Sequence, residues 1–148
     1  MSTVQPWRIA AALRAAASDG HSLWVDAQGS SMDRTIVSGD QVRIGPEARP
    51  RWGSVWAYCG PDGAILVHRF IGRRPGGLLF QGDGRGAPDP LVGPDVLIGR
   101  VTAVRTPDGR VRTLGTRDRL RRGLPLRLRS DARRVAASLR RRSGRIRR

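Results

Sequence analysis

The chain contains no lysine, since all 28 of its basic residues are arginine. An arginine side chain stays protonated in proteins, so it cannot serve as a general base. Mechanisms that need a neutral lysine amine are therefore excluded. Cysteine is almost as scarce: Cys59 is the only one, and no disulfide can form within the chain.

Long hydrophobic runs are also missing. No stretch of the 148 residues approaches the ~18 apolar residues that a membrane-spanning helix needs. The first 20 residues are alanine-rich, but Arg8 and Arg14 interrupt them, which is not the pattern of a signal peptide. We therefore expect a cytoplasmic protein, either free or peripheral at a membrane. We expect no metal site and no cofactor.

The charge is distributed unevenly along the chain. Residues 1–104 contain 11 arginines and 9 acidic residues, a net charge of +2, whereas residues 105–148 contain 17 arginines and 3 acidic residues, a net charge of +14. The chain thus consists of a nearly neutral part followed by a strongly basic tail. We expect an N-terminal helical segment over 1–21, a β domain over 22–106 and an Arg-rich tail over 107–148.

Short hydrophobic runs separated by Gly, Pro and Asp dominate the middle of the chain. This pattern is typical of β-strands joined by tight turns. The runs are SLWVDA, DQVRIG, SVWAYC, AILVHRFIG, GLLFQG and VLIGRVTAV, and residues 59–64 (CGPDGA) have the composition of a hairpin turn. Residues 6–17 instead show helical spacing of apolar side chains. The predicted fold class is mostly β, a compact antiparallel barrel-like domain preceded by a short helix.

The basic tail has a helical pattern over residues 130–142. Ser130 is a candidate N-cap, and Ala132, Val135, Ala136 and Leu139 form an apolar stripe flanked by arginines. A basic amphipathic helix suits an anionic membrane surface or an acidic protein. Nucleic acid is a less favoured partner, because the tail has no aromatic residue to stack on bases.

Two residues are candidates for chemistry. Ser31 follows a predicted strand within Gly29-Ser30-Ser31-Met32 and precedes a turn. A nucleophilic serine needs such a rigid, accessible position, with a base and backbone N–H donors nearby. His68 lies in the most apolar strand, so it is either that base or a core histidine satisfied by one hydrogen bond.

Four segments occur in an order that resembles the signal peptidase I family of serine endopeptidases. They are GSSMDRTIVSGDQVRI, RWGSVWAY, LVHRFIG, and QGDGRGAPD followed by VLIGRV, which together span about residues 22–104. Bacterial members carry a lysine base in the third segment, whereas archaeal and endoplasmic-reticulum members carry histidine there. His68-Arg69-Phe70 resembles the histidine type, here as a soluble catalytic domain without a transmembrane anchor.

The resemblance implies that Ser31 is the nucleophile and His68 its general base. An unperturbed histidine has a pKa near ~6.5 and can take a serine proton when a carboxylate holds its other ring nitrogen. Asp89 matches the family's third catalytic residue, and Asp83 is kept in reserve as a structural or supporting carboxylate.

The resemblance also implies an oxyanion hole and a substrate contact. The backbone N–H of Ser31 supplies one donor. Gly29 stands where some bacterial members carry a hydroxyl, so Ser30 or a backbone N–H supplies the second donor. Gly29 and Met32 are expected to contact the substrate.

The implied function is a serine endopeptidase that removes a leader or signal segment from a peptide or protein through an acyl-enzyme. A self-cleaving repressor of the SOS type shares the β fold, but it needs a lysine and a DNA-binding domain larger than the N-terminal segment here. The alternative is a catalytically inactive relative that binds peptides and docks to an acidic partner or membrane through its basic tail.

Overall fold

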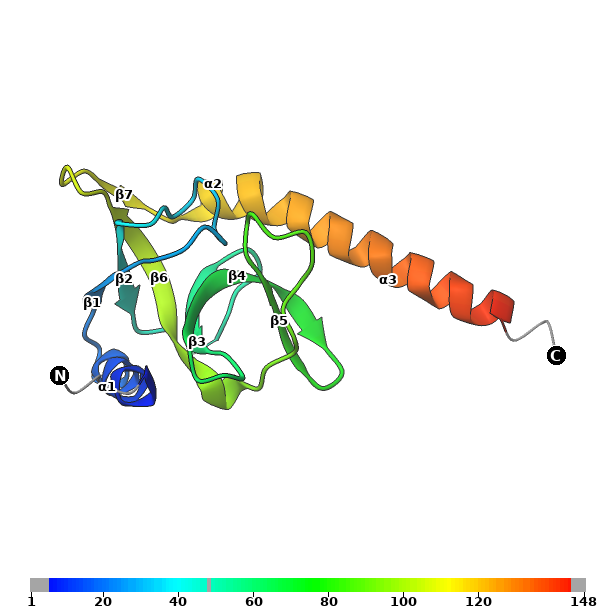
Figure 1. The fold of residues 1–148 in the computed structure, drawn as a ribbon, viewed down its shortest axis with the longest axis horizontal. Coiled ribbons are helices and arrows are strands. Elements are labelled where there is room, and N and C mark those ends of the chain that lie inside the picture. Colours follow the sequence, from blue (N-terminus) through cyan, green and yellow to red (C-terminus); the bar gives the residue numbers. More distant parts are fainter. Residues whose placement is uncertain (1–5, 48, 145–148) are drawn as a thin grey trace.

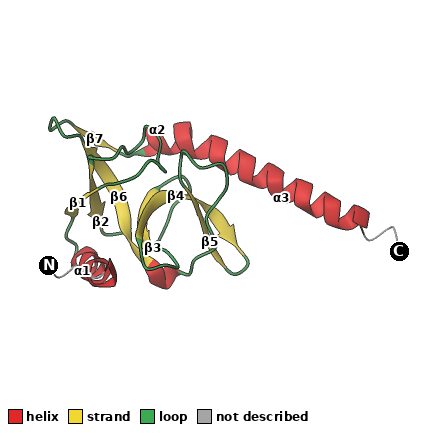
Figure 2. Cartoon of the chain, in the orientation of Figure 1, coloured by secondary structure: helices red, strands yellow, loops and turns green. Residues whose placement is uncertain are grey.

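The described residues form a seven-stranded antiparallel sheet with one helix before it and another after it (Figures 1 and 2). The structure, a computed structural model, describes residues 6–47 and 49–144, with the side chains at 6, 139 and 142–144 excepted. The strands are β1 (Leu23–Asp26), β2 (Gln41–Gly45), β3 (Val55–Cys59), β4 (Ile65–Arg74), β5 (Gly77–Gln81), β6 (Leu97–Arg105) and β7 (Val111–Thr113). The helices are α1 (Pro6–Ser18), α2 (Thr116–Asp118) and α3 (Leu124–Gly144), with a 3-10 turn η1 (Pro94–Val96) and a π-helical turn η2 (Arg119–Gly123).

The strands lie in the order β1-β2-β6-β3-β4-β5, and β7 pairs with β6. The prediction of a mostly β protein with a short N-terminal helix and a C-terminal helix is confirmed. A closed barrel is not formed by strand pairing: among the described strands, β1 pairs only with β2 and β5 only with β4. The sheet is therefore open.

Alternating side chains of the strands form two main cores. One lies under α1, where Ala10 and Leu13 pack with residues of β2, β3 and β6 such as Val101. The other is aromatic, with Tyr58 stacked on Phe80 at a ring distance of 4.5 Å. Because successive residues of a strand face opposite sides, β3 and β4 contribute to both cores.

The basic tail is part of the folded unit over about half its length, which differs from the predicted boundary at 106/107. β7 pairs with β6 across that boundary, so the two belong to one hairpin. α2, η2 and α3 then follow one another without a break from Thr116. Leu126 is buried against Ile71 and Leu79, and this contact explains why the helical region begins well before residue 130.

Ser130 does not cap a helix, contrary to the prediction, because it lies inside α3. It is buried and accepts a hydrogen bond from Arg74 at 3.4 Å. Asp131, which pairs with Arg74 at 3.2 Å, is the last tail residue with a recorded ion pair to the sheet. Beyond it, α3 projects away from the domain (Figure 1). No described helix has the length and apolar character needed to cross a membrane.

Arg69 of β4 connects its strand to three other segments: the loop after β5, the loop before β3 and helix α2. Its side chain is fully buried and binds both oxygens of Asp83, each at 2.7 Å. It also donates to Asp118 of α2 at 2.8 Å and to the carbonyl of Gly53 at 2.7 Å. Burial acts to lower the pKa of Arg69, but the two carboxylates outweigh it and raise that pKa above its ordinary value. Arg69 therefore remains charged and holds the C-terminal segment on the domain.

We expect Asp118→Asn to lower the free energy of unfolding by about 1.5–3 kcal/mol, because it weakens a hydrogen bond between charged groups at a buried arginine. The measurement is urea unfolding. Asp108→Asn is the matched control, since Asp108 pairs with Arg110 at an exposed position and its loss should change stability by less than about 0.5 kcal/mol. Equal effects of the two substitutions would contradict the anchoring role of Asp118.

Candidate active site

Ser31, His68 and Asp89 lie in hydrogen-bond contact although they are far apart in the sequence. The Oγ atom of Ser31 is 2.9 Å from Nε2 of His68, and Nδ1 of His68 is 2.5 Å from Oδ2 of Asp89. An ionised carboxylate can only accept, so Nδ1 carries the proton and Nε2 is free to accept the serine O–H. The histidine is buried, and Ser31 is half-buried.

Each of the three residues is held by a different part of the fold. His68 lies on β4 and pairs with Trp56 of β3. Asp89 lies in the loop after β5, and its N–H donates to the carbonyl of Phe80 at 2.8 Å. Ser31 lies in the loop between β1 and β2. Strand pairing therefore places the base, and two loops bring the other two residues to it.

Two glycines allow the Ser31 loop to pack directly on the loop after β5. The N–H of Gly84 donates to the carbonyl oxygen of Ser31 at 2.9 Å. A Cβ atom at Gly82 would lie 2.4 Å from that same oxygen, closer than side-chain atoms approach backbone. The Gly82-Asp83 pair therefore has a steric role at the site that the sequence did not reveal.

Tyr58 is a residue of the site that sequence analysis missed. Its hydroxyl donates to Oδ2 of Asp89 at 2.7 Å and lies 3.4 Å from Nδ1 of His68. The only sequence signal is weak: Tyr58 is the single tyrosine of the chain, on the strand next to the histidine strand. Its contact with Asp89 could not be predicted because Asp89 belongs to a loop.

Hydrogen bonds keep Asp89 charged, and burial keeps Tyr58 protonated. Burial acts to raise the pKa of Asp89, but hydrogen bonds from His68 and Tyr58 leave it below its ordinary value. Burial, assisted by the neighbouring Asp89, raises the pKa of Tyr58. Asp89 thus stays an acceptor, and Tyr58 a donor, throughout the neutral pH range.

Asp83 does not contact His68. Its carboxylate binds Arg69 and accepts a hydrogen bond from the buried hydroxyl of Thr35. Asp83 thus ties the histidine strand to the loop that follows Ser31. Asp40, at the end of that loop, accepts a hydrogen bond from the N–H of Val37 at 2.9 Å and so stabilises its turn.

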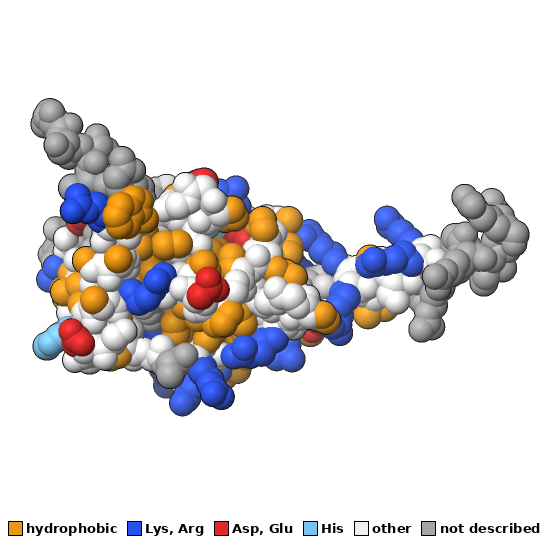
Figure 3. Space-filling model, turned by 90° about the horizontal axis from the view of Figure 1, so that it is seen from below, with side chains coloured by type: hydrophobic (Ala, Val, Ile, Leu, Met, Phe, Trp, Pro, Cys, Tyr) orange, Lys and Arg blue, Asp and Glu red, His pale blue; other side chains and the backbone are white. Residues whose placement is uncertain are grey.

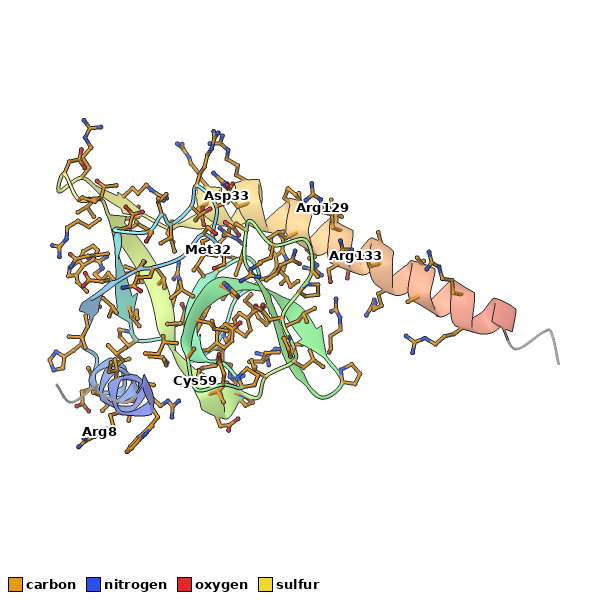
Figure 4. The ribbon with its side chains drawn as sticks, viewed as in Figure 1. Arg8, Met32, Asp33, Cys59, Arg129 and Arg133 are labelled. Atoms are coloured by element: carbon orange, nitrogen blue, oxygen red, sulfur yellow. The ribbon has the colours of Figure 1, made fainter. Side chains whose placement is uncertain are left out.

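The predicted oxyanion and substrate residues surround Ser31. Gly29 and Ser30 are exposed, and Gly29 adopts a φ of 89° that favours glycine. Met32 points into the protein and is buried in the core under α1 (Figure 4). Within the described part of the chain, the Ser31 N–H has no recorded hydrogen-bond acceptor, so it can donate to a ligand.

A pocket of about 310 Å³ opens beside Ser31 and His68. Its walls come from two strand edges, one from β1 and the residues after it (Val25–Gly29), the other from the first half of β4 (Ile65–His68). Strands β1 and β4 have no partner along these edges among the described residues, because β5 joins β4 only from Arg69 onward. Core side chains such as Met32 and Ile36 form the floor.

This arrangement can activate a serine hydroxyl. A carboxylate orients the imidazole, the imidazole accepts the serine proton, and a donor at the serine N–H can stabilise a developing oxyanion. Among the described residues, no group of three His, Cys, Asp or Glu side chains is placed to hold a metal ion.

Comparison with known proteins does not identify a family for this chain. No protein-family model matches the chain, and no curated protein matches its sequence.

We expect Tyr58→Phe to slow the reaction of Ser31 with an organophosphonate reagent about tenfold or more, because Asp89 loses a hydrogen bond that holds it in place. It should also raise the pKa of Asp89, since a donor to the charged form is removed. The measurements are labelling kinetics and an NMR titration of the Asp89 carboxyl. An unchanged rate together with an unchanged titration would contradict this positioning role.

Proposed function

We propose that the protein is a serine endopeptidase similar to the histidine-type signal peptidases, which removes a leader or signal segment from a peptide or protein. The observation that carries this proposal is the hydrogen-bonded series Ser31–His68–Asp89, with distances of 2.9 and 2.5 Å, beside an open apolar pocket. The motifs that resemble the family supply the same three residues.

In the proposed reaction, Ser31 Oγ attacks the carbonyl carbon of the scissile peptide bond while His68 Nε2 takes its proton. Asp89 stabilises the imidazolium that forms. The oxyanion accepts hydrogen bonds from the N–H of Ser31 and from Ser30. The tetrahedral intermediate expels the amine, which takes the proton from His68, and leaves an ester on Ser31. Water, activated by the same histidine, then hydrolyses the ester.

The substrate would bind as an extended chain between the two strand edges. An extended peptide adds to an unpaired edge through backbone hydrogen bonds, and a pocket that receives its alternate side chains gives selectivity. The edges of β1 and β4 both border the pocket at Ser31. This geometry supports binding of an extended substrate in the gap between the two strand edges, and the resemblance to the family implies small residues before the cleaved bond.

The first test is labelling of the purified protein with a fluorophosphonate probe. We expect wild type to react and Ser31→Ala or His68→Ala to lose the label, with a decrease of at least about 10³-fold, because nucleophile and base act as one unit. Asp89→Asn should lower the rate by about 10³–10⁴-fold, because the imidazole loses the carboxylate that orients it. Bound label is quantified by mass spectrometry.

Matched controls come from the same residue types. Ser38→Ala and His21→Ala remove an exposed serine and the other histidine of the chain, and both should label like wild type. Label that persists in Ser31→Ala would overturn the proposal. Wild type that never reacts, yet binds extended peptides, would favour the inactive peptide-binding relative instead.

The second test concerns selectivity. We expect Val25→Ala, which enlarges the pocket, to raise cleavage after larger apolar residues, relative to cleavage after alanine, by about tenfold. The measurement is mass spectrometry of the sites cut in a mixed peptide library. Leu23→Ala is the control, because Leu23 lies on the same edge strand but does not line the pocket. A cleavage profile that is identical for the three proteins would exclude this pocket as the selectivity site.

A further inference from the structure

The C-terminal helix α3 has two different faces. Leu126 and Ser130 are buried on the side that packs against the sheet. Leu124, Leu128 and Val135 are 45%, 60% and 56% exposed. With Ala132, which is also exposed, they are spaced by four, four and three residues and so share the opposite face. We call Leu124, Leu128, Ala132 and Val135 the apolar stripe of α3. It shares Ala132 and Val135 with the stripe predicted from the sequence, whose Leu139 side chain lies outside the described ones.

Arginines border the stripe on both sides. By helical position, Arg127 lies on one side of it and Arg129 on the other, and Arg133, Arg134 and Arg140 are directed toward the face opposite the stripe. The side chains of Arg129 and Arg133 are labelled in Figure 4. Viewed from below, the projecting helix carries arginine groups with apolar atoms between them (Figure 3). The long arginine stems can lie along an apolar surface while their charges remain in a polar layer.

Among the described side chains, no ion pair balances the arginines of α3 that follow Asp131. The three acidic residues of the tail are already paired: Asp108 with Arg110, Asp118 with Arg69, and Asp131 with Arg74 and Arg127. After Asp131 the sequence contains no acidic residue. Neighbouring arginines on a helix repel one another, so an anionic surface would stabilise this part of α3.

We propose that the apolar stripe of α3, together with the arginines beside and opposite it, docks on an anionic lipid surface. An apolar face with a strongly basic opposite face and low overall hydrophobicity is what a helix needs to lie in the headgroup layer. Nucleic acid would bind the arginines through its phosphates but would leave the apolar stripe exposed to water. A second copy of α3 would cover the stripe but bring like charges together. This proposal does not depend on the reaction at Ser31.

The test uses the full-length protein and co-sedimentation with phosphatidylcholine vesicles that contain about one third phosphatidylserine. We expect wild type to bind these vesicles, to bind pure phosphatidylcholine vesicles at least about tenfold more weakly, and to be released by salt. Leu128→Gln/Val135→Gln should weaken binding by about tenfold or more, because two exposed apolar side chains no longer enter the lipid. Arg133→Gln/Arg140→Gln should weaken it by about fivefold per charge.

Val111→Gln is the matched control, because Val111 is a 54% exposed hydrophobic residue on β7, away from α3. It should bind like wild type. Circular dichroism confirms that each variant folds, and fluorophosphonate labelling of Leu128→Gln/Val135→Gln should equal that of wild type.

Four results would overturn the proposal. They are no binding to anionic vesicles, equal binding to neutral ones, salt-sensitive binding that Leu128→Gln/Val135→Gln leaves unchanged, and a lipid-free dimer that this double substitution dissociates. The third result would indicate that the helix binds an acidic macromolecule through charge alone. The fourth would assign the stripe to a second copy.

Discussion

The buried guanidinium of Arg69 is the interaction on which the rest of the structure depends. It follows His68 directly in β4, so alternation along the strand directs the two side chains to opposite faces of the sheet. On one face His68 meets Ser31 and Asp89; on the other, Arg69 meets Asp83 and Asp118. A buried charge is stable only when it is fully paired. The loop after β5, which carries Asp83, and the C-terminal segment, which carries Asp118, must therefore both pack against this strand.

The candidate active site follows from that constraint. Asp83, held by Arg69, accepts a hydrogen bond from Thr35, four residues after Ser31. The backbone of the same loop contacts the carbonyl of Ser31 through Gly84. Asp89 comes six residues after Asp83 in the same loop. It contacts Nδ1 of His68, whereas Ser31 contacts Nε2 of the same ring. One loop therefore positions both the nucleophile and the carboxylate, and the strand positions the base between them.

The C-terminal segment combines structural packing with an exposed surface. Its first part pairs with β6, supplies Asp118 to Arg69 and buries Leu126 against the sheet. The face of α3 that points away from the sheet carries the exposed apolar stripe, and the part of α3 after Asp131 extends beyond these contacts with an excess of positive charge. Because α2, η2 and α3 follow one another without a break, a surface bound by the projecting helix would be held at a definite orientation to the domain.

The sequence by itself determined six of the seven strands, the hairpin turn at residues 59–64 and the identity of Ser31, His68 and Asp89 as candidates; the short strand β7 matches none of the predicted runs. Alternating hydrophobic patterns, turn residues and ordered motifs are local, so they can be read from neighbouring residues. Only the tertiary structure decided that Asp89 rather than Asp83 contacts His68 and that Tyr58 joins it. It also decided that Asp118 of the basic tail completes the pairing of Arg69. These contacts join residues 14 to 49 positions apart, and no local pattern encodes which loop reaches which strand.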